Sequence, residues 1–553
     1  MPTGLQYCAK DAFKYTNLSK VVCPAFLPPL TGGDFIGGNY CILYVPEWTL
    51  NRYKLASNWN LFAYIEPIPG VYPNHISVYT EESIAVPETA LATDYRPFLE
   101  LVKYDDSNVG RLTVRGDQPL LLGTFKMEQT RDNNTMTALM NYGTLTADSV
   151  VTQLNLSTRT WHYLSFPYDV KVSDIATLGD WVIRRYDGAA RAQAEFGNTW
   201  KTVPYDSILH AGEGYIWYST NGNFSIPAMP NNNRNLIFAN DVRYTELQEN
   251  ASSTAANYGW NLIGNPYPSF YDTRFMDYSA PITVRNGSSY TAYSPMDDSY
   301  ILKPLEAFFV QCSSESNLVG FDAEGRQTNN TVRTLTMAPK RARTTMSERS
   351  VFNLILRNEQ HADRTRFVIN EDATVDYEIS CDAAKFMSED LLVPQLYTLE
   401  NGERMAINER PVADGMIALG AYFGQEGNHT IALDTQTSGM TVVLIDHQTG
   451  IETDLTAEDY TFTAKAGTAN NRFSIRLNGG LIEGVADAIV GETMVYATAE
   501  GISVNNAMAP ISLYNVAGQL VDTNNGTAAN FNVPAGVYIV KVGNVTYKVN
   551  VVK

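Results

Sequence analysis

The runs Gly536-Val-Tyr-Ile-Val-Lys-Val542 and Val545-Thr-Tyr-Lys-Val-Asn-Val551 stand near the C-terminus, with only Gly543-Asn544 between them. Both runs are rich in valine and aromatic residues, which favour strands. A Gly-Asn pair between two such runs indicates a hairpin turn, because glycine supplies the positive φ that the turn requires. In the second run apolar residues alternate with polar ones, so one face would be buried. The stretch therefore predicts a half-buried antiparallel hairpin.

The composition of the whole chain also favours strands. The chain has 553 residues, and at roughly 150 residues per domain we expect several domains. It contains 33 Tyr and 22 Phe, whereas charged residues make up only 18%. This balance is typical of strands rather than of solvated helices. We predict an all-β, multidomain chain of antiparallel β-sandwiches.

The charge and hydropathy of the chain exclude some partners. Acidic residues outnumber basic ones 59 to 40, so the net charge of -19 would repel a polyanion and argues against nucleic acid as a partner. We expect no transmembrane span, because no stretch approaches the roughly 18 to 20 apolar residues that a membrane helix needs. The first ten residues lack the basic and apolar regions of a signal peptide. We therefore expect that a longer precursor has lost its start.

An internal repeat occupies the middle of the chain. The stretch 161–168 aligns with 260–267, keeping Trp, an aliphatic residue, Pro and Tyr at the same spacing. Further along, 209–217 aligns with 302–310. The offsets of 99 (from 161 to 260) and 93 (from 209 to 302) predict a duplicated β unit over 156–327.

The remaining segments are assigned from local pattern. Residues 69–155 contain short apolar runs between polar turns and are predicted to be β-rich. Residues 328–348 are polar and locally basic, as is typical of an interdomain linker. Residues 349–480 contain several further strand-like runs. We predict that these runs form another β-sandwich.

The N-terminal segment has the order strand, loop, strand, helix. Its run Leu43-Tyr44-Val45-Pro46, followed by Tyr53, Trp59, Phe62 and Ile65, resembles the last repeat of BspA-like leucine-rich-repeat surface proteins. The resemblance implies a partial leucine-rich-repeat cap over 1–68 and a role in adhesion. Because a solenoid repeat packs against its neighbour, we expect a truncated solenoid in which residues 1–20 are poorly packed.

The C-terminal blocks LYNVAGQLV (513–521), PAGVYIVKV (534–542) and V.VVK (549–553) resemble the type A C-terminal sorting domain of type IX secretion cargo. The resemblance implies a sorting domain over 488–553, and the stretch before it resembles the β-sandwich that commonly precedes such domains. Carried over to this sequence, the sorting-signal residues are Leu513, Tyr514, Asn515, Gly518, Pro534, Gly536, Tyr538, Lys541 and Lys553.

The same resemblance implies a location and partners. It implies recognition by the outer-membrane secretion machinery and an extracellular or cell-surface protein, attached to the outer membrane after export. For the body we expect binding to a host or matrix protein or to a glycan. The first alternative is a carbohydrate-binding module, with Trp200 as candidate ligand-binding residue, since its surroundings Gly197-Asn-Thr-Trp200-Lys-Thr predict exposure. The second is an accessory part of a secreted hydrolase.

The sequence contains no strong catalytic pattern. It has no G-x-S-x-G elbow, no H-E-x-x-H and no phosphate-binding loop. His162, Ser165 and Asp169 lie close in the first copy of the repeat, but the second copy has Asn261 and Gly264 in place of the first two. We therefore predict no enzyme activity, no catalytic residue, no cofactor and no metal site.

The cysteines and acidic pairs leave alternatives open. Cys23 with Cys41 is the only plausible disulfide, and two free thiols are the favoured alternative. Acidic pairs at 105–106, 297–298 and 458–459 could bind calcium, but solvated loop charge is favoured.

Overall fold

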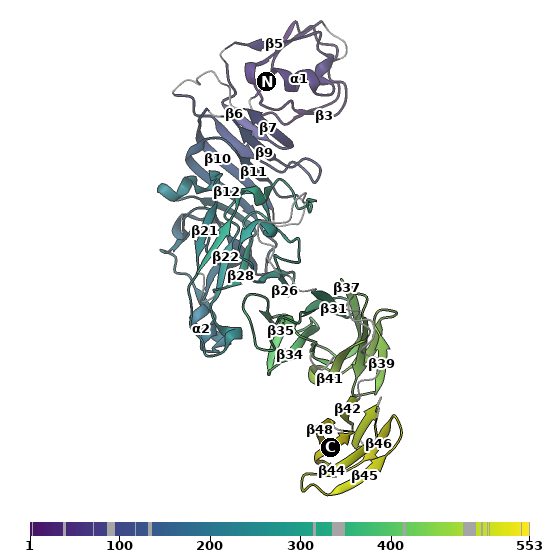
Figure 1. The fold of residues 1–553 in the computed structure, drawn as a ribbon. Helices are drawn as coiled ribbons and strands as arrows, with labels where there is room; N and C mark the ends of the chain where they lie inside the picture. Colours follow the sequence, from purple (N-terminus) through teal and green to yellow (C-terminus); the bar gives the residue numbers. More distant parts are fainter. Residues whose placement is uncertain are drawn as a thin grey trace. The chain divides into compact units, whose positions relative to one another are not determined.

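Figure 1 shows a computed structural model of the chain. It describes residues 1–551 except 3, 37–39, 70, 86–93, 117, 131–134, 313–316, 335–348, 413–415, 479–493, 499–500, 506, 508 and 544. The chain divides into two compact units, Met1–Asn478 and Gly479–Lys553. Strands dominate, and the α-helices α1 (Leu50–Leu55) and α2 (Gly188–Ala192) are short. The predicted all-β class is confirmed.

Within the described ranges, the structure contains no helix with the length and apolar character needed to cross a membrane.

The N-terminal segment forms a parallel sheet of β2 (Lys20–Val22), β4 (Ile42–Pro46) and β5 (Tyr64–Ile68). Lys20 pairs with Ile42, and Ile42 with Tyr64, so each strand stacks on the one 22 residues before it. Helix α1 follows β4. The steps of 22 lie within the range of leucine-rich repeats, roughly 20 to 29 residues.

Two aromatic residues that carried the N-terminal pattern fill its core. The hydroxyl of Tyr53 donates to the carbonyl of Ala25 at 3.0 Å, and the indole of Trp59 donates to that of Pro29 at 2.7 Å. Cys23 and Cys41 are buried free thiols, so the structure favours two free thiols over a disulfide.

The first 20 residues are packed only in part. Strand β1 (Tyr7–Cys8) pairs with β3 (Leu30–Thr31), and Cys8 is buried. Tyr15 and Leu18 are exposed.

Residues 75–155 are rich in strands, as predicted, and the strands form parallel stacks, so the antiparallel sandwiches predicted for the chain as a whole are wrong here. One stack contains β6 (His75–Val78), β8 (Phe98–Leu101), β10 (Leu120–Thr130) and β12 (Leu145–Asn155); the other contains β7 (Glu81–Ala85), β9 (Arg111–Arg115) and β11 (Ala138–Asn141). Residues pair across steps of 23 to 30 positions: His75 with Phe98 and Glu81 with Arg111. This is a solenoid, whose pairing partners a local pattern does not reveal.

The duplicated unit continues from the solenoid. Strand β20 (Asn223–Pro227) of the first copy pairs antiparallel with β12. Because this pairing covers the last parallel strand, the solenoid sheet has no open edge there. The sheet then ends at β15 (Ala176–Thr177).

The two copies have four-stranded antiparallel sheets of the same order. The first copy contains β13 (His162–Ser165), β19 (Gly214–Ser219), β16 (Trp181–Tyr186) and β17 (Trp200–Thr202). The second contains β22 (Trp260–Gly264), β28 (Ala307–Gln311), β25 (Ile282–Asn286) and β26 (Ser289–Tyr293). Each sheet thus places its first strand, β13 or β22, at an edge.

The copies meet through these edge strands in a reciprocal way. The amide of Ser165 donates to the carbonyl of Leu305 at 3.1 Å, and that of Gly264 donates to the carbonyl of Gly212 at 3.0 Å. Under the repeat offsets, 165 corresponds to 264 and 212 to 305. The contact is therefore the same in both directions, which defines a local pseudo-two-fold axis.

Residues 349–478 form one extended sheet that folds around a large apolar core. Its strands are β31 (Ser350–Arg357), β32 (Ala362–Ile369), β33 (Ala383–Ala384), β34 (Gln395–Glu400), β35 (Glu403–Arg410), β36 (Met416–Phe423), β37 (Gly427–Gln436), β38 (Thr441–Asp446), β39 (Ile451–Asp454), β40 (Tyr460–Ala464) and β41 (Gly467–Asn478). We call this part the 349–478 domain. Most of the predicted linker lies outside the described residues.

The C-terminal unit has two small antiparallel sheets and its own apolar core. Its strands are β42 (Met494–Thr498), β43 (Gly501–Asn505), β44 (Ile511–Asn515), β45 (Leu520–Asn524), β46 (Ala529–Asn532), β47 (Gly536–Val542) and β48 (Val545–Val551). Strands β47 and β48 form the predicted hairpin, with Val542 opposite Val545. Val549 and Val551 are buried as predicted, but Val545 is 54% exposed.

Because the two copies approach each other closely at Gly264, we expect a larger residue there to destabilise the fold. A Cβ at Gly264 would lie 1.9 Å from the Cβ of Ser165. We expect Gly264→Ser to lower the free energy of unfolding by about 1–3 kcal/mol through overpacking, measured by urea denaturation. The swapped double variant, Ser165→Gly with Gly264→Ser, should regain most of this loss. Gly197→Ala is the control, because a Cβ there meets nothing within 4 Å; an equal effect at both glycines would contradict the prediction.

Candidate functional site

Several of the predicted sorting-signal residues stabilise the fold of the C-terminal unit. Leu513 and Tyr538 are buried in its core. The hydroxyl of Tyr538 donates to the carbonyl of Pro534 at 3.1 Å, which ties β47 to the preceding loop. Gly536 begins β47, and Lys541 lies exposed on it.

The turn between β44 and β45 depends on two further residues of that set. The side-chain oxygen of Asn515 accepts from the amides of Ala517 and Gln519, both at 3.0 Å. Gly518 has a φ of 77°, which favours glycine. Tyr514 is half-buried, and Lys553 lies outside the described residues. Leu513, Asn515, Gly518 and Tyr538 therefore shape the unit, whereas Lys541 presents an exposed side chain.

Trp200 does not form the exposed platform expected of it. It is half-buried, and its ring centroid lies 5.3 Å from that of Tyr186 and 5.8 Å from that of Tyr163. It is also 6.3 Å from Phe309 of the second copy. Trp200 therefore belongs to an aromatic cluster between the copies.

The three residues considered as a catalytic set have separate partners. The ring of His162 bonds through Nε2 to the carbonyl of Ser157 at 2.8 Å. The carboxylate of Asp169 accepts from the side-chain amides of Asn231 and Asn233 at 2.8 and 2.9 Å. Ser165 lies at the contact with Gly264. The geometry does not join them into a nucleophile and base.

A pocket of about 320 Å³ lies between the copies, and we call it the inter-repeat pocket. One wall is Trp161, His162 and Tyr163 of the first copy. The other wall comes from the second copy and contains Arg285, Gly287, Ser288, Lys303, Glu306 and Ala307. The pocket combines an indole with two cationic groups and one carboxylate.

The pseudo-two-fold axis produces a second pocket, of about 290 Å³, which we call the twin pocket. Here the second copy supplies the Trp-containing strand, with Trp260 and Asn261, and the first copy supplies Tyr186, Gly188 and Glu213. The twin pocket also contains the charged residues Arg185, Asp187 and Glu246. Its excess of acidic groups contrasts with the cationic inter-repeat pocket.

The two cationic residues of the inter-repeat pocket, Arg285 and Lys303, have different partners. Arg285 donates to the carboxylate of Glu389 and to the hydroxyl of Tyr290, at 2.5 and 3.2 Å. The ammonium of Lys303 lies 3.9 Å from Glu306, which is only 2% exposed. Sequence reasoning missed both cations. An alignment of the two copies could have indicated them, because the first copy has Tyr186 at the position of Arg285 and His210 at the position of Lys303.

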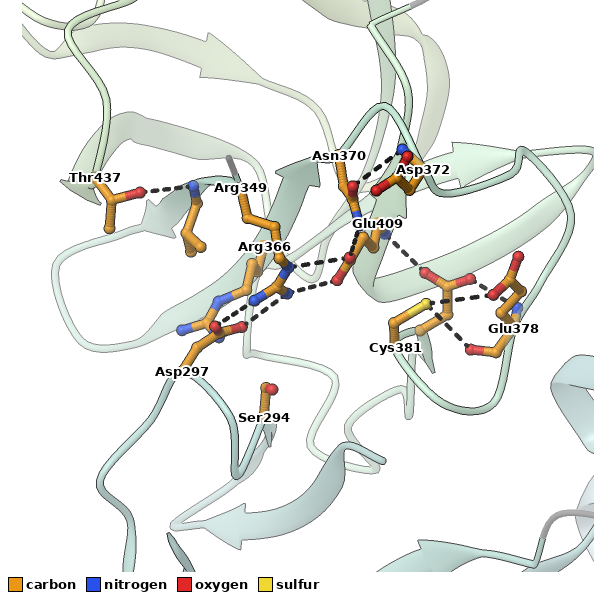
Figure 2. Close-up of polar contacts among 12 residues, drawn as sticks. Ser294, Asp297, Arg349, Arg366, Asn370, Asp372, Glu378, Cys381, Glu409 and Thr437 are labelled. Atoms are coloured by element: carbon orange, nitrogen blue, oxygen red, sulfur yellow. Dashed lines mark hydrogen bonds and ion pairs between the residues drawn. The ribbon is translucent and has the colours of Figure 1, made fainter. Parts of the chain in front are cut away.

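The acidic pair at 297–298 binds arginines. Figure 2 shows Arg349 between Asp297 and Glu409, at 2.6 and 2.5 Å. Arg366, which is 3% exposed, donates to Asp298 at 2.6 Å. These pairs join the second copy to the 349–478 domain, so the calcium alternative fails for Asp297 and Asp298.

A buried carboxyl group lies beside this network. The oxygens of Asp382 accept from the amides of Glu378 and Glu409 at 2.8 and 2.7 Å. Burial raises the pKa of Asp382 to about 7, with a further rise from the carboxylates of Glu409 and Glu378. Burial likewise raises the pKa of the Cys381 thiol, whose Sγ points to Glu378 (Figure 2). Cys381 is thus a protonated thiol of low nucleophilicity.

Comparison with protein families finds one match. Residues 269–477 match a family model described as a domain of unknown function (DUF8693). This range covers most of the second copy and nearly all of the 349–478 domain. No curated protein and no solved structure matches the chain.

Breaking a buried ion pair should lower the free energy of unfolding more than breaking an exposed one. Asp298→Ala leaves the guanidinium of Arg366 without its main partner in a buried position, so we expect a loss of about 3 kcal/mol in the free energy of unfolding. The control is Asp459→Ala, which breaks the exposed pair with Arg357 and should cost less than about 1 kcal/mol. Urea denaturation measures both, and losses of similar size would refute the assignment.

The raised pKa of Asp382 predicts a pH dependence. The neutral carboxyl stabilises the folded chain at low pH, and this contribution is lost as pH rises through about 7. In Asp382→Asn the side chain cannot ionise. The free energy of unfolding of the variant minus that of the parent should therefore rise between pH 5 and pH 7, by up to about 1.4 kcal/mol per pH unit. Denaturation series at pH 5, 6 and 7 measure this difference, and a constant value would contradict it.

Proposed function

We propose that this chain is a non-catalytic secreted or cell-surface protein, exported by a type IX secretion system through its C-terminal unit. The observation that carries the proposal is the independent apolar core of that unit, which contains Leu513, Tyr538 and Val540. A compact unit with its own core can act as a folded handle for an export apparatus. The proposed partner is the outer-membrane secretion machinery, and the proposed location is the outer surface.

For the body of the protein we propose a binding role. Stacked parallel strands support this proposal, because solenoids present extended surfaces to partners. We further propose that β2, β4 and β5 are the end of a leucine-rich-repeat array and that the 349–478 domain is a β-sandwich. The separate partners of His162 and Asp169 support a non-catalytic body.

A second candidate function is carbohydrate binding by the repeat. The inter-repeat pocket favours it, because an indole beside polar groups is a common way of holding a sugar ring. Under this proposal the ligand would meet Trp161, while Trp200 supports the wall from within the aromatic cluster.

Export can be tested in the full chain. Deleting 545–553 removes β48, which supplies Val549 and Val551 to the core. In a host with the secretion system we expect this variant to accumulate in the periplasm, as measured by cell fractionation. Export at the level of the parent chain would overturn the proposal.

A second export experiment separates a folded handle from a linear tag. Leu513→Asp places a charge in the core of the C-terminal unit and should block export, whereas the exposed control Asp522→Asn should not. Equal export of both variants would show that the machinery does not need the folded unit.

A further inference from the structure

We propose that the inter-repeat pocket binds a carboxylate-bearing sugar, with Lys303 and Arg285 facing the carboxylate and Trp161 facing the ring. The proposal rests on the binding role proposed above and gives that role a ligand class. It does not depend on the route of export.

Lys303 is the strongest indication of an anionic ligand. Its ammonium lies 3.9 Å from Glu306, and it donates no hydrogen bond to any residue that the structure describes. Its side chain is 20% exposed within a lined pocket. An ammonium with unused donors in a concave site suits a carboxylate.

The neighbouring carboxylate does not cancel this preference. The side chain of Glu306 accepts from the hydroxyl of Tyr300 at 3.1 Å and from the backbone amide of Lys303 at 2.7 Å. Because these bonds hold the Glu306 side chain in the wall, it fixes the loop that carries Lys303. Arg285 lies on the same wall, but its guanidinium is already paired with Glu389 at 2.5 Å, so Lys303 is the cation with unused donors.

The duplication supplies an internal comparison. Arg184 pairs with Ile216 in the first copy, and Thr283 with Phe309 in the second, so 186 corresponds to 285. The first copy forms the same sheet with Tyr186 there and with His210 at the position of Lys303. The four-stranded sheet therefore forms without these cations. Arg285 has a structural partner in Glu389, at 2.5 Å, whereas Lys303 has no such close partner and is the cation that points to a ligand.

The size and walls of the pocket indicate a sugar as the carrier of the carboxylate. A volume of about 320 Å³ lies at the lower end for small-molecule sites, which suits one ring rather than a chain. Trp161 offers an apolar surface to the C–H face of a sugar ring, while Thr160, His162 and Ser288 are polar residues suited to its hydroxyl groups.

Calorimetric titration of the purified full chain at low salt tests the proposal. The probes are D-glucuronate, D-glucose and an acidic peptide of glutamates. We expect glucuronate to bind at least tenfold more tightly than glucose, and more weakly as salt is added. Absence of glucuronate binding, or equal binding of glucose, would overturn the proposal. Tighter binding of the peptide would replace the sugar by a protein ligand.

Two charge-removing variants locate the site. Lys303→Gln should weaken glucuronate binding at least tenfold, and Arg185→Gln, in the twin pocket, should leave it unchanged. Urea denaturation should give the parent's midpoint for both variants. An effect of equal size from Arg185→Gln would move the site to the twin pocket. Because protein made without export serves for this experiment, its failure is separate from failure of the secretion proposal.

Discussion

The reciprocal backbone contact between the two copies is the constraint on which the 1–478 unit depends. Ser165 and Gly264 occupy corresponding positions and meet each other, and a Cβ at Gly264 would lie 1.9 Å from that of Ser165. One of the two positions therefore has to be glycine. The replacement of Ser165 by Gly264, which argued against a catalytic set in the sequence, is thus a packing requirement. The inter-repeat pocket and the twin pocket both exist because the edge strands meet in this way.

The second copy also links the repeat to the domain that follows it. Asp297 and Asp298 of the second copy bind Arg349 and Arg366 of the 349–478 domain across this junction. Buried ion pairs contribute little net stability but penalise arrangements in which a charge loses its partner. They therefore favour one orientation of the two parts. The family match over 269–477 includes both sides of the junction, which agrees with their close packing.

The success of sequence reasoning differed along the chain for a physical reason. The C-terminal hairpin and the repeat were readable, because alternation and turn residues act over a few positions. The parallel stacking of 75–155 could not be predicted in this way. His75 pairs with Phe98 across 23 positions, and nothing in the local sequence marks that partner. Trp200 was misjudged because its neighbours in sequence are polar, whereas Phe309 reaches it from the other copy. The same distance in sequence hid the arginine partners of Asp297 and Asp298.

The sequence alone determined the all-β class, the duplication and the closing hairpin, because these follow from composition and short-range periodicity. Tertiary structure decided which strands stack in parallel, which acidic residues lie beside arginines and which cations line a pocket. These features depend on contacts between residues far apart in the chain. Their energies arise only when folding removes the side chains from water and fixes them next to one another.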